Sequence, residues 1–241
     1  MNVENPHSRK RARGDLVSTQ DVSTQDVSTR TEAGYRRIRH DIVSGALSPG
    51  TTLTETGLTG SYGMSRTPIR DALNRLEHDG LLRRVVRGYE VPKRDVEEII
   101  DIYNVRIALE VTAVVSACER ATTRDISALN AMFERACSET DRAVKTELNR
   151  KWHLSAVSIG KNRTASELLE RTVAQLAPYN SARIEVHENL EETDAEHRGV
   201  MEAIASRDQD AARRLLSRHL ERVRDVRIRA WEQDEILGYE H

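Results

Sequence analysis

The sequence after Arg94 contains almost no residue that ends a helix, and this restricts the fold more than any other feature. Apolar residues recur there at three- and four-residue steps, which is the spacing of one buried helix face. Aromatic residues make up only 4% of the chain, which favours helices over a β-sandwich. We therefore predict an antiparallel helical bundle, in which Pro178 kinks or breaks the fourth helix. The six predicted helices span Asp95–Arg120, Thr123–Arg142, Lys145–Ile159, Thr164–Val186, Leu190–Ser206 and Asp208–Glu235.

The stretch from Met64 to Gly80 predicts one helix with two different faces. Ser65 stands where a helix cap is expected, and Gly80 follows the end. The apolar face carries, at helical spacing, Ile69, Ala72, Leu73 and Leu76. Off that face, near the start of the helix, lie side chains that can donate to phosphates and guanine edges in a major groove, namely Arg66, Thr67 and Arg70. The alternative is a surface helix whose arginines are only solvated.

The segments around this helix predict a winged helix-turn-helix. A helix over Thr31–Ser44 and a short helix over Glu55–Ser61 precede it. Two short strands follow, Leu82–Val86 and Tyr89–Val91, and form a hairpin wing around Arg87-Gly88. Residues 31–94 carry eleven Lys and Arg against seven Asp and Glu, whereas residues 95–241 carry 21 against 28. A basic segment beside an acidic one indicates a polyanion-binding module joined to a second module.

The remaining features of the sequence limit the class of protein. Residues 1–30 predict a disordered tail, because three copies of a polar VSTQ/R motif cannot bury a core. The only cysteines, Cys118 and Cys137, form no CxxC motif, so neither a disulfide scaffold nor a thiolate zinc site is expected. No apolar run approaches the ~20 residues that span a bilayer. We therefore expect a cytoplasmic protein.

Residues 42–91 resemble the winged-helix domain of GntR-family transcription regulators. The turn SGALSPG, the SRTPIRDAL helix and the LEHDGLL entry to the wing all match in order. In some family members an arginine of the short second helix contacts DNA, and here that position is Thr56. The resemblance implies that DNA is contacted by Ser65, Arg66, Thr67, Arg70 and Gly88.

Three histidines lie on apolar helix faces of the predicted bundle: His153, His197 and His219. His197 lies ten residues before the turn at Arg207-Asp208, and His219 lies eleven residues after it. Antiparallel packing therefore brings both to the same level, about 15 Å from the turn. Asn149 and His153 are four residues apart, so both can face the same point from a third helix. A single buried histidine is usually a hydrogen-bonded core residue, but three that converge are better explained by a metal ion.

The same residues resemble the ligand set of the FCD domain, the all-helical effector domain of the FadR-type branch of GntR regulators. The matching segments are NRKWH, EHRGVMEAIASRD and AARRLLSRHL. The resemblance implies that the metal ligands are Asn149, His153, His197 and His219. Many relatives have an aspartate at the first position, so this ligand set lacks one negative charge. Zinc, nickel and manganese all suit such a set.

An uncompensated divalent cation with an open coordination position favours an anionic effector, most simply a small carboxylate. Arg106 lies on a helix face with Ile99 and Tyr103, and Glu110 follows one turn later. Arg106 is either a second cationic contact for an organic acid or half of an internal ion pair with Glu110. The family resemblance favours the effector contact.

The predicted fold class is mostly α, and the predicted domains are a tail (1–30), a winged helix-turn-helix domain (31–94) and an all-helical effector-binding and dimerisation domain (95–241). The predicted function is ligand-responsive transcription regulation by a homodimer on a palindromic double-stranded DNA operator. The alternative is a metal-dependent hydrolase fused to a DNA-binding module. Against an enzyme, no carboxylate is expected near the three histidines as a general base. A third possibility is an architectural DNA binder with a purely structural metal.

Overall fold

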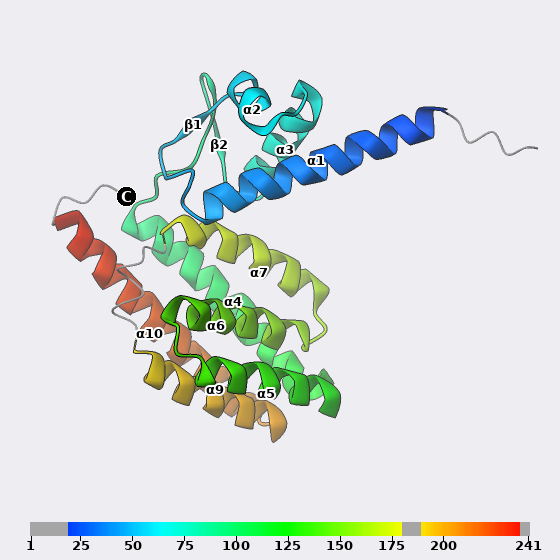
Figure 1. Ribbon diagram of the computed structural model, residues 1–241. Helices are drawn as coiled ribbons and strands as arrows, with labels where there is room; N and C mark the ends of the chain where they lie inside the picture. Colours follow the sequence, from blue (N-terminus) through cyan, green and yellow to red (C-terminus); the bar gives the residue numbers. More distant parts are fainter. Residues whose placement is uncertain (1–18, 180–188, 237–241) are drawn as a thin grey trace, which may run out of the picture.

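The computed structural model describes residues 19–179 and 189–236, and it contains a small N-terminal part seated on a helical bundle (Figure 1). The N-terminal part consists of α1 (Thr19–Val43), β1 (Thr52–Leu53), α2 (Glu55–Tyr62), α3 (Arg66–His78), β2 (Arg83–Val85) and β3 (Gly88–Glu90). The bundle consists of α4 (Val96–Arg120), α5 (Thr123–Ser138), α6 (Arg142–Ser158), α7 (Arg163–Leu176), the 3-10 helix η1 (Ala177–Tyr179), α9 (Leu190–Ala205) and α10 (Gln209–Ile236). The mostly α fold is confirmed. None of the described helices is long and apolar enough to cross a membrane.

The N-terminal part is a winged helix-turn-helix built on the apolar face of α3. Its predicted stripe is fully buried and packs against Ile38 and Ile42 of α1. Strand β3 pairs antiparallel with both β2 and β1, so the sheet order is β1-β3-β2. The predicted hairpin wing is confirmed. Strand β1 was not predicted, because a two-residue strand has no periodicity that a sequence pattern can reveal.

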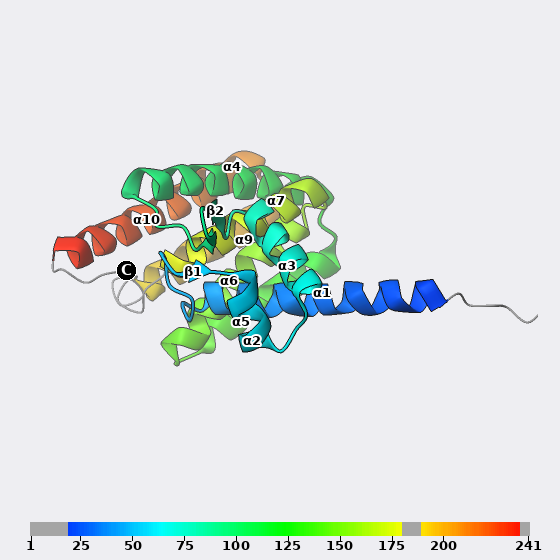
Figure 2. The same ribbon diagram turned by 90° about the horizontal axis from the view of Figure 1, so that it is seen from above.

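Helix α1 begins at Thr19 and not at Thr31 as predicted, so residues 19–30 of the predicted tail are helical. Its N-terminal end projects beyond the rest of the protein in both views (Figures 1 and 2). The packed part of α1 supplies the helix nucleus, and each further residue then gains a backbone hydrogen bond at little cost. No glycine or proline between Thr19 and Ala33 stops this propagation. The remainder of the predicted tail, residues 1–18, lies outside the described residues.

The part of the bundle that the structure describes contains the six α-helices expected after Arg94, but α5 ends at Ser138 and not at Arg142 as predicted, and the bounds of α6 and α7 also differ. Helix α6 begins at Arg142, because the Asp141 carboxylate accepts a hydrogen bond from the Val144 amide and caps the first turn. Helix α7 ends at Leu176, and Pro178 lies in η1. Proline removes a backbone donor and disfavours helix in the residue before it, which explains this end. The predicted extension to Val186 lies outside the described residues from 180 on.

The C-terminal half of α7 joins the bundle to the winged helix-turn-helix. Ala174 belongs to the apolar core of the N-terminal part. Gln175 Nε2 donates to the Asp79 carbonyl at 2.9 Å, at the residue that follows α3. Arg94 donates to the Gly80 carbonyl at 3.0 Å and to Gln175 Oε1 at 3.3 Å. The end of α3 is therefore held directly by the bundle.

The wing depends on Gly88, which has φ +115° and lies against the carbonyl of Leu53 in β1. A Cβ at this position would lie 2.3 Å from that oxygen. The glycine is thus required by the packing of the wing, whatever its contact with DNA.

We expect Gly88→Ala to lower the free energy of unfolding by about 1–3 kcal/mol, because alanine disfavours positive φ and its Cβ meets backbone. The matched control is Gly60→Ala in α2, where a Cβ has open space and alanine favours the helix by about 1 kcal/mol. Thermal or urea unfolding of both variants measures the difference. A Gly88→Ala protein as stable as the wild type would contradict this account of the wing.

Candidate functional site

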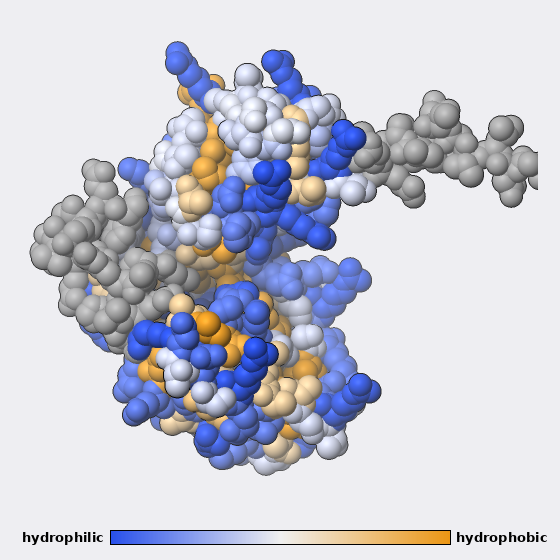
Figure 3. All heavy atoms as spheres, in the orientation of Figure 1, coloured by the Kyte–Doolittle hydropathy of each residue, from blue (hydrophilic) through white to orange (hydrophobic). Residues whose placement is uncertain are grey.

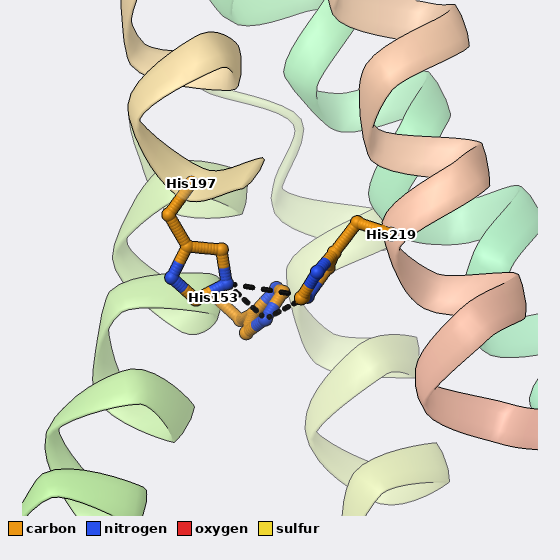
Figure 4. A group of neighbouring side chains, drawn as sticks. All are labelled: His153, His197 and His219. Carbon is orange, nitrogen blue, oxygen red and sulfur yellow. Dashed lines mark hydrogen bonds between the residues drawn. The ribbon is translucent and has the colours of Figure 1, made fainter. Parts of the chain in front are cut away.

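Three imidazoles from three helices of the bundle converge on one point. His153 comes from α6, His197 from α9 and His219 from α10 (Figure 4). Their Nε2 atoms are 3.2 Å apart in all three pairs. All three residues are buried, with 7%, 1% and 1% of their surface exposed. The predicted equal depth of His197 and His219 in antiparallel helices agrees with this geometry.

Two of the three imidazoles contact a glutamate carboxylate through Nδ1. Glu110 Oε2 lies 2.6 Å from His153 Nδ1, and Glu196 Oε2 lies 2.6 Å from His219 Nδ1. The sequence analysis expected no carboxylate near the histidines as a general base; these two glutamates do lie near them, but they contact Nδ1 and not the shared Nε2 centre. Glu110 lies 43 positions in sequence from His153, which it contacts. Glu196 directly precedes His197 in the sequence but contacts His219. One available signal was the position of Glu110 on the same buried face as Arg106.

The third imidazole has a different environment. The ring of His197 stacks on that of Trp152, with centroids 4.1 Å apart and planes at 17°. Its Nδ1 is buried and has no hydrogen-bond partner among the described residues. Burial lowers the pKa of His197 well below its usual value. Burial also lowers the pKa of His219, to about 4, although its bond to Glu196 favours the charged form. Both rings are therefore neutral near pH 7, which is the form that binds metals.

The spacing of the three nitrogens suits a metal ion. Metal–imidazole bonds of about 2.1 Å separate two ligand nitrogens by about 3.0 Å at a right angle and about 3.4 Å at the tetrahedral angle. The observed 3.2 Å lies between these values. The three nitrogens can therefore form one face of a tetrahedral or octahedral site, with the remaining positions directed elsewhere.

The imidazoles line a cavity of about 270 Å³ within the part of the chain that the structure describes. Asn149, the fourth predicted ligand, lines it too, and its Nδ2 is buried without a hydrogen-bond partner among the described residues. Arg106 also lines the cavity, but its Nε donates to Glu110 Oε1 at 2.6 Å. The internal ion pair, which was the alternative for Arg106, is thus present. Val43 of α1 forms part of the same wall, so both parts of the protein contribute to the cavity.

A second group of predicted site residues lies in the N-terminal part, at the start of α3. Ser65, Arg66, Thr67 and Arg70 are all exposed at the start of α3. Ser65 is the cap residue, as predicted, but its side chain makes no capping hydrogen bond, so the hydroxyl is available to an outside partner. The first turn of α3 carries no acidic residue. Thr56 in α2 is exposed as well.

The wing contacts the second half of α3, because Arg84 and Tyr89 both donate to Asn74 Oδ1, and Val86 at the tip of the wing is fully exposed. Figure 3 shows hydrophilic side chains projecting from the end of the molecule formed by α2, α3 and the wing. Exposed arginines, a helix N-terminus free of acids and an adjacent wing form a surface of the kind that contacts DNA backbone and base edges.

A winged helix-turn-helix joined to a helical bundle with an internal polar cavity defines a DNA-binding regulator with a ligand-binding domain. Residues 30–88 match the family described as bacterial regulatory proteins of the gntR family, and residues 101–222 match the FCD domain. The chain therefore belongs to the GntR family of transcription regulators and carries an FCD domain.

Known relatives agree with this assignment. The chain is 29% identical over 194 residues to the uncharacterized HTH-type transcriptional regulator YdhC of Bacillus subtilis, covering 77% of this chain and 85% of that protein. It is 27% identical over 188 residues to the Nta operon transcriptional regulator of Aminobacter aminovorans, covering 75% and 86%. The solved structure of McbR/YncC from E. coli shares the fold, with a TM-score of 0.68 at 22% identity over 85% of this chain and 98% of that one. The protein is a DNA-binding transcription regulator and not an enzyme.

We propose that Arg66 and Arg70 read the operator, and we expect Arg66→Ala or Arg70→Ala to weaken specific binding. Where the arginine contacts a base, discrimination at that base pair should fall by about 1–3 kcal/mol. The melting temperature should hardly change, because both side chains are exposed. Binding is measured on duplexes that the wild-type protein selects from a random pool.

The matched control is Arg124→Ala, which removes one exposed arginine from α5, a helix of the bundle outside the winged helix-turn-helix. Normal affinity and specificity in both α3 variants would refute the proposed reading surface.

Proposed function

We propose that this regulator responds to a small organic acid, which binds beside a divalent metal ion in the helical domain and changes operator affinity. The observation that carries the proposal is the triangle of three buried Nε2 atoms, 3.2 Å apart, at the wall of a cavity. Gathering three buried imidazoles in this way is unfavourable without a cation, since each Nε2 loses its water without gaining a good partner.

The residues proposed to hold the metal are His153, His197 and His219, with the Asn149 amide oxygen as a fourth ligand. The donor set is three nitrogens and one neutral oxygen, which zinc, nickel or manganese would accept. When bound, the ion would supply a positive charge and an open position for a carboxylate oxygen. The protein supplies a cavity large enough for a small molecule and too small for a polymer.

The walls of the cavity support a link to DNA binding. Val43 belongs to α1 of the winged helix-turn-helix, whereas Val173 and Leu176 belong to α7. The neighbouring residues Ala174 and Gln175 contact the core and the α3 end of the DNA-binding part. A ligand that binds one placement of α1 or α7 better than another shifts the protein toward that placement, and the position of α3 changes with it.

We also propose that the protein acts as a homodimer on a palindromic operator in double-stranded DNA. A single winged helix-turn-helix reads one half-site, and two copies related by two-fold symmetry read two. Action on chromosomal DNA implies a cytoplasmic location.

The metal proposal predicts that His197→Ala loses bound metal and the stability that metal lends, since a ligand that binds only the folded state stabilises it. Helical content should persist, because the apolar core of the bundle does not include the ion. Elemental analysis, thermal unfolding with and without chelator, and circular dichroism measure these effects. His78→Ala, which removes a histidine of α3, is the control and should keep its metal. Stoichiometric metal in a His153→Ala/His197→Ala/His219→Ala triple variant would mean that the site lies elsewhere.

The effector proposal predicts opposite effects of Asn149→Asp on metal and on acid. The new carboxylate should tighten metal binding and weaken an anionic effector. At an effective dielectric constant of about 20, two unit charges ~4 Å apart interact by roughly 4 kcal/mol before desolvation. Even a quarter of that weakens effector binding several-fold. Titrations of metal into metal-free protein, and of small mono- and dicarboxylic acids into the metal form, measure both affinities.

Asn130→Asp, an equal change of charge at an exposed position of α5, is the control and should alter neither affinity. If Asn149→Asp also left both affinities unchanged, Asn149 would not be a ligand and the charge-balance argument for an acid would fail.

A further inference from the structure

Two similar chains of hydrogen bonds reach Nδ1 of His153 and Nδ1 of His219. In the first, Arg106 Nε donates to Glu110 Oε1 at 2.6 Å, and the other carboxylate oxygen lies 2.6 Å from His153 Nδ1. In the second, Arg222 donates to both oxygens of Glu196, at 2.8 and 2.5 Å, and Oε2 lies 2.6 Å from His219 Nδ1. We call these the Arg106 relay and the Arg222 relay.

The relays determine which ring nitrogen carries the proton. Each glutamate is paired with an arginine, since Arg106 donates to Glu110 and Arg222 donates to both oxygens of Glu196, and an arginine partner favours the ionised carboxylate. An ionised carboxylate only accepts hydrogen bonds, so Nδ1 of His153 and of His219 must donate. The lone pair of each ring is then on Nε2, and both lone pairs point to the shared centre. Two lone pairs 3.2 Å apart repel each other unless a cation lies between them.

His197 lacks such a relay. Its Nδ1 has no partner among the described residues, and its ring is held by stacking on Trp152. Two of the three rings are therefore oriented by charge and hydrogen bonds, and one by packing alone. This asymmetry makes the relays a specific feature of the site and not a general consequence of burying histidines in a bundle.

We propose that Glu110 and Glu196 are positioning residues for the metal, which set the ligand tautomer of His153 and His219 and supply the negative charge that Asn149 does not. Arg106 and Arg222 hold these carboxylates in place, so the role of Arg106 is to orient Glu110. The inference rests on the proposed metal function. Carboxylates that accept from metal-bound histidines raise the basicity of the ring, and removing them typically weakens metal binding by 10–100-fold.

The most direct test is Glu110→Gln. Arg106 Nε requires an oxygen acceptor, so the amide oxygen of the glutamine should face Arg106 and its NH₂ group should face His153 Nδ1. Nδ1 must then accept, and the ring proton moves to Nε2, where it blocks the ligand position. We expect the imidazole ¹⁵N shifts of the metal-free variant to report this tautomer, and zinc affinity, measured by competition with a chelator, to fall at least ~10–100-fold.

Two further variants separate the relay from a general effect of charge or folding. Glu196→Gln in the more exposed Arg222 relay should also weaken zinc binding by at least ~10-fold, and it remains a test if Glu110→Gln fails to fold. Glu192→Gln is the matched control, because Glu192 pairs with the same Arg222 at 3.6 Å but contacts no imidazole in the described part of the chain. Its zinc affinity and tautomers should equal those of the wild type.

The outcomes distinguish this inference from the proposed function. A wild-type protein that binds zinc, with unchanged tautomers and affinity in both relay variants, would overturn the inference and leave the metal site intact. Equal weakening by Glu192→Gln would also overturn it, because charge alone would then explain the effect. A wild-type protein that binds no zinc, nickel or manganese would overturn the proposed function itself.

Discussion

The mutual repulsion of ring nitrogens directed at one buried point is the constraint on which the bundle interior depends. Such a cluster is stable only where each ring is held in the correct orientation, by a hydrogen bond on its outer side or by packing. The two relays orient His153 and His219 by hydrogen bonds, and stacking on Trp152 orients His197. These residues come from α4, α6, α9 and α10, so the polar centre, and not only apolar contact, fixes how the four helices meet.

The same bundle holds the DNA-binding part through α7. Residues of α7 line the cavity. Near the end of α7, Gln175 donates to the Asp79 carbonyl just after α3, where the following Gly80 has a left-handed backbone conformation. In the proposed function, α7 and its immediate neighbours therefore connect the cavity to the helix that would read DNA. A small displacement at the cavity would then be transmitted to α3, because packed helices move as units.

Periodicity and turn chemistry in the sequence correctly predicted the helices, the wing and the buried stripe of α3. The meeting of His197 and His219 also followed from counting residues on either side of one turn. Contacts such as Glu110–His153 did not follow, because they depend on how α4 rotates against α6, and residue spacing within a helix contains no information on that rotation. The early start of α1 was missed because helix propagation needs no apolar pattern. Gly88 was interpreted as a DNA contact, whereas the Leu53 carbonyl already requires a glycine there.

Two consecutive residues of α9, Glu196 and His197, both take part in the imidazole cluster. His197 belongs to the cluster, while Glu196 supports His219 on the next helix. Neighbouring residues on a helix point about 100° apart, so both contacts exist at only one rotation of α9 about its axis. Inserting or deleting one residue between the start of α9 and Glu196 leaves the pair intact, but the same change between His197 and the turn at Arg207 rotates both away together. Within α9, the imidazole cluster therefore tolerates a change of length only on the N-terminal side of Glu196.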